Sequence, residues 1–164
     1  MERNDPTIYI RLAEERDTTA IASVLYASFV EYQAFYTPAA FTATTPTPAQ
    51  IQNRLSEGSV WVAWHHDVLV GTISAVPQGV GLYLRSMAVL PSARGYGVGR
   101  VLVQHVEQFA VAQGYKYLVL RTTPFLTHAI RLYEQVGFQR NNAGPHELYG
   151  TPLFTMLKPI MLTI

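Results

Sequence analysis

The chain has no cysteine, few charged residues and no long apolar run. The absence of cysteine excludes disulfides, thiolate catalysis and zinc–thiolate sites, and it fits a reducing cytosol. Charged residues make up 14% of the 164 residues and hydrophobic residues 49%, a profile that excludes intrinsic disorder. No apolar run approaches the roughly 18 residues of a membrane span, and the N-terminus lacks the apolar core of a signal peptide.

The charges of the chain nearly cancel, because 12 Lys and Arg residues face 11 Asp and Glu residues, a formal net charge of +1. No overall field therefore draws the protein to nucleic acid or to an anionic membrane, and we expect neither as a partner. Ten of the twelve basic residues are arginine, whose planar guanidinium suits phosphates and carboxylates. Length and composition together predict a single cytoplasmic domain over residues 1–164.

Hydrophobic periodicity and helix-breaking residues predict a mixed α/β (α+β) domain. The expected strands are Thr7–Leu12, Ser59–Trp64, Val68–Val76, Leu82–Val89, Tyr117–Arg121, Phe138–Asn141 and Leu153–Leu157. The expected helices run from Asp17 or Thr18 to about Tyr32, from Pro48 to near Gly58, from the loop Arg94–Gly99 to Gly114, and from Thr123-Pro124 to Gly137. Residues 37–48, rich in Thr, Pro and Ala, are expected to form a loop, and His65-His66-Asp67 a hairpin turn. The resulting order is β-α-α-β-β-β-α-β-α-β-β.

The strongest local signal is a glycine-rich turn between a strand and an amphipathic helix, with the sequence Arg94-Gly95-Tyr96-Gly97-Val98-Gly99-Arg100. Alternating glycines let backbone N–H groups turn toward one point, without a Cβ to block a ligand. The helix N-terminus adds unpaired N–H groups and the positive end of its dipole. The two flanking arginines add charge. The turn therefore predicts an anion site, most naturally for a phosphate or pyrophosphate.

Two common phosphate motifs do not fit this turn. A Walker A loop needs Gly-Lys-Ser/Thr, but Gly99 is followed by Arg100-Val101. A dinucleotide fingerprint that begins at Gly95 needs glycine at position 100, and an acidic residue near position 119, where the chain has Val119. A loop that only turns the chain is the remaining alternative, although three spaced glycines with flanking arginines exceed what a turn requires.

Two motifs together resemble the GNAT superfamily of acyl-CoA-dependent N-acetyltransferases. Arg94–Gly99 matches its Arg/Gln-x-x-Gly-x-Gly/Ala signature, and the preceding Met87–Pro91 resembles the family's strand end. Ala129–Phe138 (AIRLYEQVGF) resembles the second hallmark, and the two motifs lie at the family's spacing. The resemblance implies a splayed mixed sheet of about seven strands flanked by four helices. In that fold the strand ending at Val89 and the strand Tyr117–Arg121 part to hold acetyl-CoA.

The resemblance also implies roles for individual residues, and it implies acetyl-CoA as co-substrate without a metal. Backbone groups of Met87 and Val89 would pair with the pantetheine arm, and amides of the glycine-rich turn would hold the pyrophosphate. The implied acyl-CoA site consists of Met87, Ala88, Val89, Arg94, Gly95, Tyr96, Gly97, Val98, Gly99 and Arg100. Tyr133 would protonate the leaving thiolate, a role that suits a phenol, which is a proton donor at neutral pH.

The chain departs from the family at two places. Leu126 stands where many members carry an asparagine that bonds the pantetheine or the helix start, and Thr127 and Thr123 are the candidate substitutes for it. No Asp or Glu lies between Val68 and Val106, where many members have a general base. A water molecule as the base, and an acceptor amine that arrives already neutral, remain open as alternatives to a carboxylate base. The candidate bases elsewhere in the chain are Glu31, His128, His146 and Glu147.

The acceptor side is expected around an aromatic-rich segment and the central strand. The rings of this segment belong to Phe29, Tyr32, Phe35, Tyr36 and Phe41. The resemblance implies that the segment covers the acceptor pocket and favours an apolar or aromatic acceptor, with Glu31 placed to hold an ammonium group; core or lid packing of the same rings is the alternative. Tyr83 and Arg85 alternate with two leucines and are placed to face the cleft, and Arg85 hints at a carboxylate on the acceptor. The candidate acceptor residues are Phe29, Glu31, Tyr32, Tyr83 and Arg85.

We therefore expect an N-acetyltransferase that passes an acetyl group from acetyl-CoA directly to a primary amine of a small molecule. Tyr133 serves as general acid, and the Val89 N–H polarises the thioester carbonyl. A non-catalytic acyl-CoA-binding sensor or partner module is one alternative, favoured by Leu126 and by the missing central carboxylate. A peptide or protein N-acetyltransferase with an open groove is the other. The exposed C-terminal strands leave room for a homodimer through sheet edges.

Overall fold

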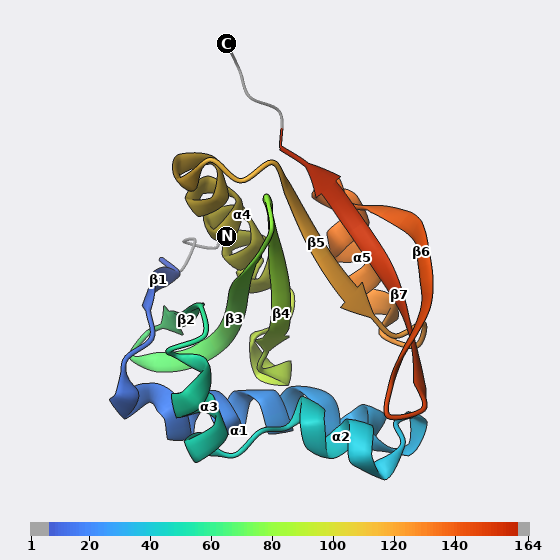
Figure 1. The fold of residues 1–164 in the computed structure, drawn as a ribbon. Coiled ribbons are helices and arrows are strands. Elements are labelled where there is room, and N and C mark those ends of the chain that lie inside the picture. Colours follow the sequence, from blue (N-terminus) through green and yellow to red (C-terminus); the bar gives the residue numbers. More distant parts are fainter. Residues whose placement is uncertain (1–6, 161–164) are drawn as a thin grey trace.

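The computed structural model describes residues 7–160, which form a seven-stranded mixed sheet with helices on both faces (Figure 1). The strands are β1 (Tyr9–Leu12), β2 (Ser59–His65), β3 (Val68–Gln78), β4 (Gly81–Val89), β5 (Tyr117–Thr122), β6 (Gln139–Leu148) and β7 (Thr151–Pro159). The helices are α1 (Thr18–Phe29), α2 (Pro38–Thr44), α3 (Pro48–Arg54), α4 (Val98–Gln113) and α5 (Thr127–Gln135). The strand order is β1-β2-β3-β4-β5-β7-β6, and β4 and β5 are the parallel neighbours in it. The predicted fold class is confirmed.

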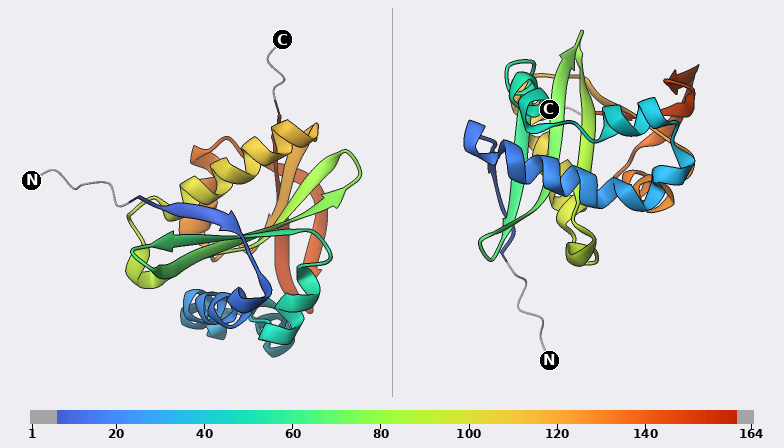
Figure 2. Two further views of the ribbon diagram at one scale, coloured as in Figure 1. Left: turned by 90° about the vertical axis from the view of Figure 1, so that its left-hand side faces the viewer. Right: turned by 90° about the horizontal axis from the view of Figure 1, so that it is seen from below.

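Strand β2 shows how a period of two places core residues on both faces of the sheet. Trp61 and Ala63 belong to the core beneath α4, whereas Val60 and Val62 belong to the core beneath α1 and α3. Figure 2 shows α4 on one side of β2–β4 and α1 to α3 on the other. The first half of the sheet, which includes β4, is therefore the middle layer of three.

The predicted ends of α4 and of the first hairpin are confirmed. Gly114 follows α4 in the left-handed conformation, with a φ of 82°, as expected for a glycine just past a helix. His66 and Asp67 have φ values of 48° and 62° between β2 and β3. Two consecutive residues with positive φ are typical of the tight turns that match the twist of a hairpin.

The prediction of a loop over residues 37–48 is wrong, because α2 lies within it. Pro38 and Pro48 occupy the first positions of α2 and α3. At that position proline loses no hydrogen bond and its fixed φ suits the helix. Thr37 and Thr47 each accept a hydrogen bond from the backbone N–H three residues later, so each Thr-Pro pair starts a helix. Residues 7–160 therefore contain five α-helices in place of the expected four.

Several other boundaries differ from the prediction, among them the end of α3, which lies at Arg54 and not near Gly58. Helix α1 ends at Phe29, and the chain continues as the 3₁₀ segment Val30–Phe35. Helix α5 begins at Thr127, because the Leu126 N–H bonds to the Thr123 carbonyl in a turn that precedes the helix. The β6–β7 hairpin is longer than predicted, since most of β6 is exposed and its hydrophobic pattern is weak.

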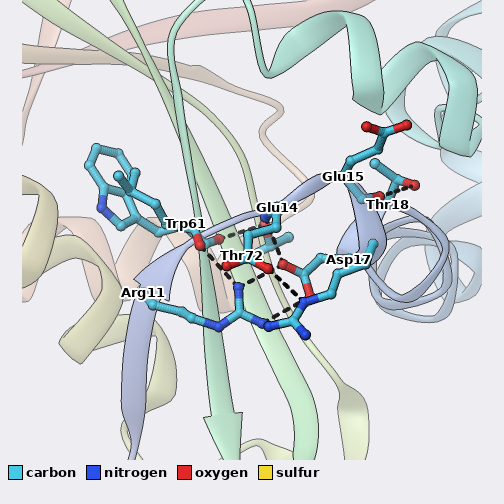
Figure 3. Close-up of polar contacts among 9 residues, drawn as sticks. Arg11, Glu14, Glu15, Asp17, Thr18, Trp61 and Thr72 are labelled. Carbon is cyan, nitrogen blue, oxygen red and sulfur yellow. Dashed lines mark hydrogen bonds and ion pairs between the residues drawn. The ribbon is translucent and has the colours of Figure 1, made fainter.

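A bidentate ion pair joins β1 to the start of α1 (Figure 3). Arg11 Nη1 lies 2.7 Å from Asp17 Oδ2, and Arg11 Nη2 lies 3.0 Å from Asp17 Oδ1. The buried carboxylate of Asp17 also accepts a hydrogen bond of 2.7 Å from the Glu14 N–H. The hydrogen bonds from Arg11 hold the pKa of Asp17 below its usual range, against the opposing effect of burial.

Asp17→Asn is expected to lower the free energy of unfolding by about 2–3 kcal/mol at pH 7, because charge-assisted hydrogen bonds at a buried site are lost. A carboxylate with a lowered folded-state pKa stabilises the fold above its unfolded pKa, and this contribution disappears as pH falls through the folded pKa. Urea unfolding should therefore give a difference between wild type and variant that holds from pH 7 to about pH 5 and shrinks below about pH 4. A difference independent of pH would contradict the role of the ion pair. Arg16→Gln, which removes the exposed pair with Glu14, serves as the control with little effect.

Candidate active site

Strands β4 and β5 pair over only part of their length. They are aligned from Gly81 opposite Tyr117 to Leu84 opposite Leu120. Beyond this point β5 continues beside β7, and β4 continues beside β3. Figure 1 shows β4 and β5 diverging toward α1 and α2. The side of β4 that faces β5 therefore has no strand partner from position 85 to position 89.

A β-bulge lies in β4 where the two strands part. Arg85 is opposite Ser74 and Ala88 is opposite Thr72, so β4 carries two residues where β3 carries one. Ser86, in this bulge, has a φ of 55°, a conformation that costs a residue other than glycine about 1–3 kcal/mol. Its hydroxyl accepts a hydrogen bond of 2.8 Å from Arg54 Nη1. Bulges re-aim the strand that carries them and are frequent beside active sites.

A hydrogen bond at the end of β4 shows to which side the N–H and C=O groups of each of its residues point. The Leu90 N–H donates to the Val70 carbonyl of the neighbouring strand. Because N–H and C=O groups of successive residues alternate sides, those of Val89 and Met87 point away from β3, toward the open side. The Val89 carbonyl indeed lies 2.8 Å from the hydroxyl of Ser28, outside the sheet. The two residues expected to pair with an extended ligand are those whose backbone faces the opening.

The divergence of the strands opens into a cleft of about 970 Å³, the size of a small-molecule site. Strand β4 and the glycine-rich turn form one wall, and β5 and α5 form the other, while residues of α1 to α3 close one end. Fourteen of the sixteen predicted site residues line the cleft: Phe29, Tyr32, Tyr83, Arg85, Met87, Ala88, Val89, Arg94, Gly95, Gly97, Val98, Gly99, Arg100 and Tyr133.

Two predicted site residues, Tyr96 and Glu31, are not among those that line the cleft. The Tyr96 side chain is exposed, and its ring centroid lies 5.7 Å from that of His65. The Glu31 carboxylate forms an ion pair with Arg94. Its charge is therefore already neutralised at the surface, which disfavours the expected contact with an acceptor ammonium group.

The glycine-rich turn has the geometry of an anion cradle. Gly95 and Gly97 have φ values of 88° and 78°, and a Cβ at either position would meet no atom within 4 Å. Within the described chain, the N–H groups of residues 95–97 donate no hydrogen bond, and those in the first turn of α4 have no partner inside the helix. The Arg94 N–H, by contrast, bonds to the Pro91 carbonyl. The cradle therefore spans Gly95–Arg100, and its geometry suits a phosphate or pyrophosphate.

Tyr133 lies on α5 with its side chain buried, 8% exposed, and it lines the cleft opposite β4. Its ring packs edge-on against Phe138, with 5.7 Å between the centroids. Burial, together with nearby Tyr83, raises the pKa of Tyr133 above its usual value of about 10. The phenol therefore keeps its proton at neutral pH and can donate it, whereas it is a poor base.

Several cleft residues were not predicted from the sequence. Arg54 closes α3, and Ser28 lies on the buried face of α1, where its hydroxyl contacts the Val89 carbonyl. A serine on an otherwise apolar helix face was the available signal for Ser28, and no local signal marks Arg54. Arg121, on β5, is a further unpredicted residue that lines the cleft, and Thr123, a candidate substitute for the missing asparagine, lines it too.

The four candidate bases lie in different places. His128, at the start of α5, lines the cleft. Glu31 is paired with Arg94, and His146 and Glu147 lie on β6 outside the residues that line the cleft. Within residues 7–160, no cluster of three His, Asp or Glu side chains is arranged to hold a metal ion. No helix in the same range is long and apolar enough to cross a bilayer.

Sequence comparison relates the chain to acetyltransferases. The model of the Acetyltransferase (GNAT) family matches residues 12–138. Mouse probable N-acetyltransferase family 8 member 5 is 40% identical over 91 residues, which cover 52% of this chain and 40% of that protein. Human N-acetyltransferase 8B is 36% identical over 86 residues, covering 49% of this chain and 38% of that protein. The chain therefore spans about two fifths of the length of these curated relatives.

Comparison of structures leads to the same fold. PaiA N-acetyltransferase from Thermoplasma acidophilum, solved in complex with coenzyme A, superposes with a TM-score of 0.80 at 16% identity, over 93% of this chain and 99% of that one. The Escherichia coli ribosomal-protein-S18-alanine N-acetyltransferase gives a TM-score of 0.74 at 18% identity, over 96% of each chain. At these identities the likeness concerns the fold alone. With its family match across both motifs and a splayed sheet around the cleft, the chain belongs to the GNAT family of acetyltransferases.

Proposed function

We propose that this protein transfers an acetyl group from acetyl-CoA directly to a primary amine of a small molecule. The observation that carries the proposal is one continuous cleft that joins the free N–H groups of Gly95–Arg100 to the buried phenol of Tyr133. The anion cradle can bind the phosphates of a CoA thioester, and the proton donor on the facing wall can protonate its sulfur when the acyl group leaves.

The wall formed by β4 offers binding groups for the acyl-CoA arm. The outward backbone groups of Met87 and Val89 provide a strand edge that an extended amide-containing chain can pair with. The Val89 N–H is the group proposed to polarise the thioester carbonyl. Ser28 contacts the Val89 carbonyl and so supports the orientation of this peptide unit. Acetyl-CoA, as co-substrate, supplies the acetyl group.

The transfer needs one bond to form, one to break and one proton to move. The amine nitrogen bonds to the acetyl carbon, the carbon–sulfur bond breaks, and Tyr133 gives its proton to the departing sulfur. The proton that nitrogen loses restores the Tyr133 phenol through solvent or a base, so that the net change moves one proton from nitrogen to sulfur. His128 is the candidate on the cleft wall for accepting the proton from nitrogen. An amine that arrives neutral needs no base before the attack, and its nitrogen loses its proton only after the new bond has formed. A covalent acyl-cysteine is excluded because the sequence contains no cysteine.

The proposal predicts saturable binding of acetyl-CoA by calorimetry, followed by amine-dependent release of the CoA thiol. A panel of small primary amines and short peptides, each assayed for thiol release, separates the proposal from its alternatives. Release with peptides alone would indicate a peptide or protein N-acetyltransferase. Tight binding of acetyl-CoA with no amine-dependent release across the panel would favour the sensor module.

A cytoplasmic location and a homodimer through the exposed edge strand β6 belong to the same proposal.

A further inference from the structure

The charges on the cleft wall are all of one sign among the described residues. Five arginines line the cleft and no Asp or Glu does: Arg54, Arg85, Arg94, Arg100 and Arg121. Arg94 and Arg100 flank the glycine-rich turn, where the phosphates of acetyl-CoA account for them. Arg54 and Arg85 meet instead at the Ser86 bulge. The proposed pyrophosphate site therefore does not account for this second pair of arginines.

Arg54 and Arg85 have guanidinium N–H groups that make no hydrogen bond within the described chain. Arg54 is half-buried, makes no ion pair within the described chain, and donates from Nη1 to Ser86. Arg85 forms an ion pair with Glu57 through Nη2, while its Nε is buried and has no hydrogen-bond partner. Because a guanidinium carries five N–H donors, most of the donors of this pair remain free.

The electrostatics of the pair also call for an anion. Two arginines and Glu57 together carry a charge of +1. Burial, and next the nearby charge of Arg85, lower the pKa of Arg54, whereas Glu57 raises it. A partly desolvated cation beside a second cation is costly unless an anion or further hydrogen bonds compensate it. A single negative charge would neutralise the group.

We infer that Arg54 and Arg85 bind a carboxylate on the acceptor, so that the acceptor is an amino acid or a similar amine that carries a carboxylate. This inference rests on the proposed function and names the substrate class for the same cleft. A planar carboxylate matches the fork of a guanidinium, and its single charge matches the +1 of the group better than a phosphate dianion does. Aromatic rings of Phe29, Tyr32 and Tyr36 line the same cleft and suit an apolar body on the acceptor.

The test compares L-phenylalanine, phenethylamine and phosphoethanolamine as acceptors. Wild type should use phenylalanine with a KM about 10- to 100-fold below that for phenethylamine, the ratio expected for charge-assisted hydrogen bonds. Arg54→Gln and Arg85→Gln should each raise the KM for phenylalanine by about 10-fold or more, with the KM for acetyl-CoA unchanged. The KM for phenethylamine, which carries no carboxylate, should rise much less than the KM for phenylalanine in both variants.

Glu57→Gln is the matched control for Arg85→Gln. It removes the same ion pair but keeps the arginine, and Glu57 is half exposed, so the fold should tolerate the change. If Arg85 binds the carboxylate, Glu57→Gln should leave the KM for phenylalanine unchanged or lower it. If Arg85 serves only to pair with Glu57, the two variants should behave alike, and this result would overturn the role of Arg85.

Calorimetry keeps this test independent of turnover. Titration of phenylalanine and of phenethylamine into the CoA-saturated protein should give tighter binding of phenylalanine, with the difference lost in Arg54→Gln. Equal binding of the two amines would overturn the inference and leave the proposed function intact, and a preference for phosphoethanolamine would overturn the carboxylate assignment. Phenylalanine binding without turnover of any amine would overturn the proposed function and leave the carboxylate site standing.

Discussion

Tyr133→Phe is expected to lower kcat by about 10²–10⁴-fold, the usual effect of losing a general acid, while the affinity for acetyl-CoA stays nearly unchanged. The substitution removes the hydroxyl and keeps the ring, whose edge-on packing against Phe138 holds α5 in place. Steady-state kinetics together with calorimetric titration of acetyl-CoA separate the two quantities. An equal loss of kcat and of affinity would remove Tyr133 from the chemistry.

The pH dependence of the wild type gives a second check on Tyr133. Burial raises the pKa of this phenol, so its protonated form persists at pH values where an ordinary tyrosine, with a pKa of about 10, begins to ionise. If Tyr133 is the acid, its phenol should stay protonated up to about pH 10, and kcat should show no decline from its ionisation in that range. A decline of kcat near pH 9 in wild type that disappears in Tyr133→Phe would contradict the raised pKa.

Tyr83 is the neighbour that has to be distinguished from Tyr133. It also lines the cleft, on β4, and contributes to the raised pKa of Tyr133. Its ring lies 5.6 Å from the guanidinium carbon of Arg121, and its side chain is less buried than that of Tyr133. Tyr83→Phe should therefore reduce kcat much less than Tyr133→Phe. The reverse order would assign the proton donor to Tyr83.

The half of the cleft expected to bind acetyl-CoA could be predicted because its parts are close together in the sequence. The strand end, the glycine-rich turn and the first turn of α4 occupy positions 87–100 without interruption. A ligand cradle made of backbone N–H groups leaves a local signature, since glycines are needed at the positions of positive φ. The strong apolar stripe of α4 then fixes the direction of the turn relative to the sheet.

The acceptor half has no such local signature. Ser28, Arg54 and Arg85 come from α1, α3 and β4, and only the tertiary fold brings them to one cleft. The bulge at Ser86 cannot be read from the sequence, because a serine in the left-handed region depends on its surroundings and not on its own preference. Proline was also ambiguous, since a proline breaks a helix in its interior but starts one at the first position, as Pro38 does in α2.

Gly97→Glu is expected to weaken the binding of acetyl-CoA by about 100-fold or more, the loss of one or two charge-assisted hydrogen bonds. Gly97 is the N-cap of α4, and a side chain there would enter open space beside the free N–H groups of the cradle. The new carboxylate would compete for those groups and repel the phosphates. Calorimetric titration with acetyl-CoA and with CoA measures the loss, which should be the same for both ligands because the cradle contacts the part they share.

Gly79→Glu separates the effect of the charge from the effect of the backbone. Gly79 lies in the β3–β4 turn with a φ of 61°, has open space around a Cβ, and is not among the residues that line the cleft. Both substitutions impose left-handed strain of roughly 1–2 kcal/mol and add one negative charge, but Gly79→Glu should keep full affinity. Gly97→Asn, which tolerates the left-handed conformation, should lose much less affinity than Gly97→Glu. Undiminished binding by a folded Gly97→Glu variant would place the phosphates of acetyl-CoA away from this turn and would remove the observation on which the acetyltransferase proposal depends.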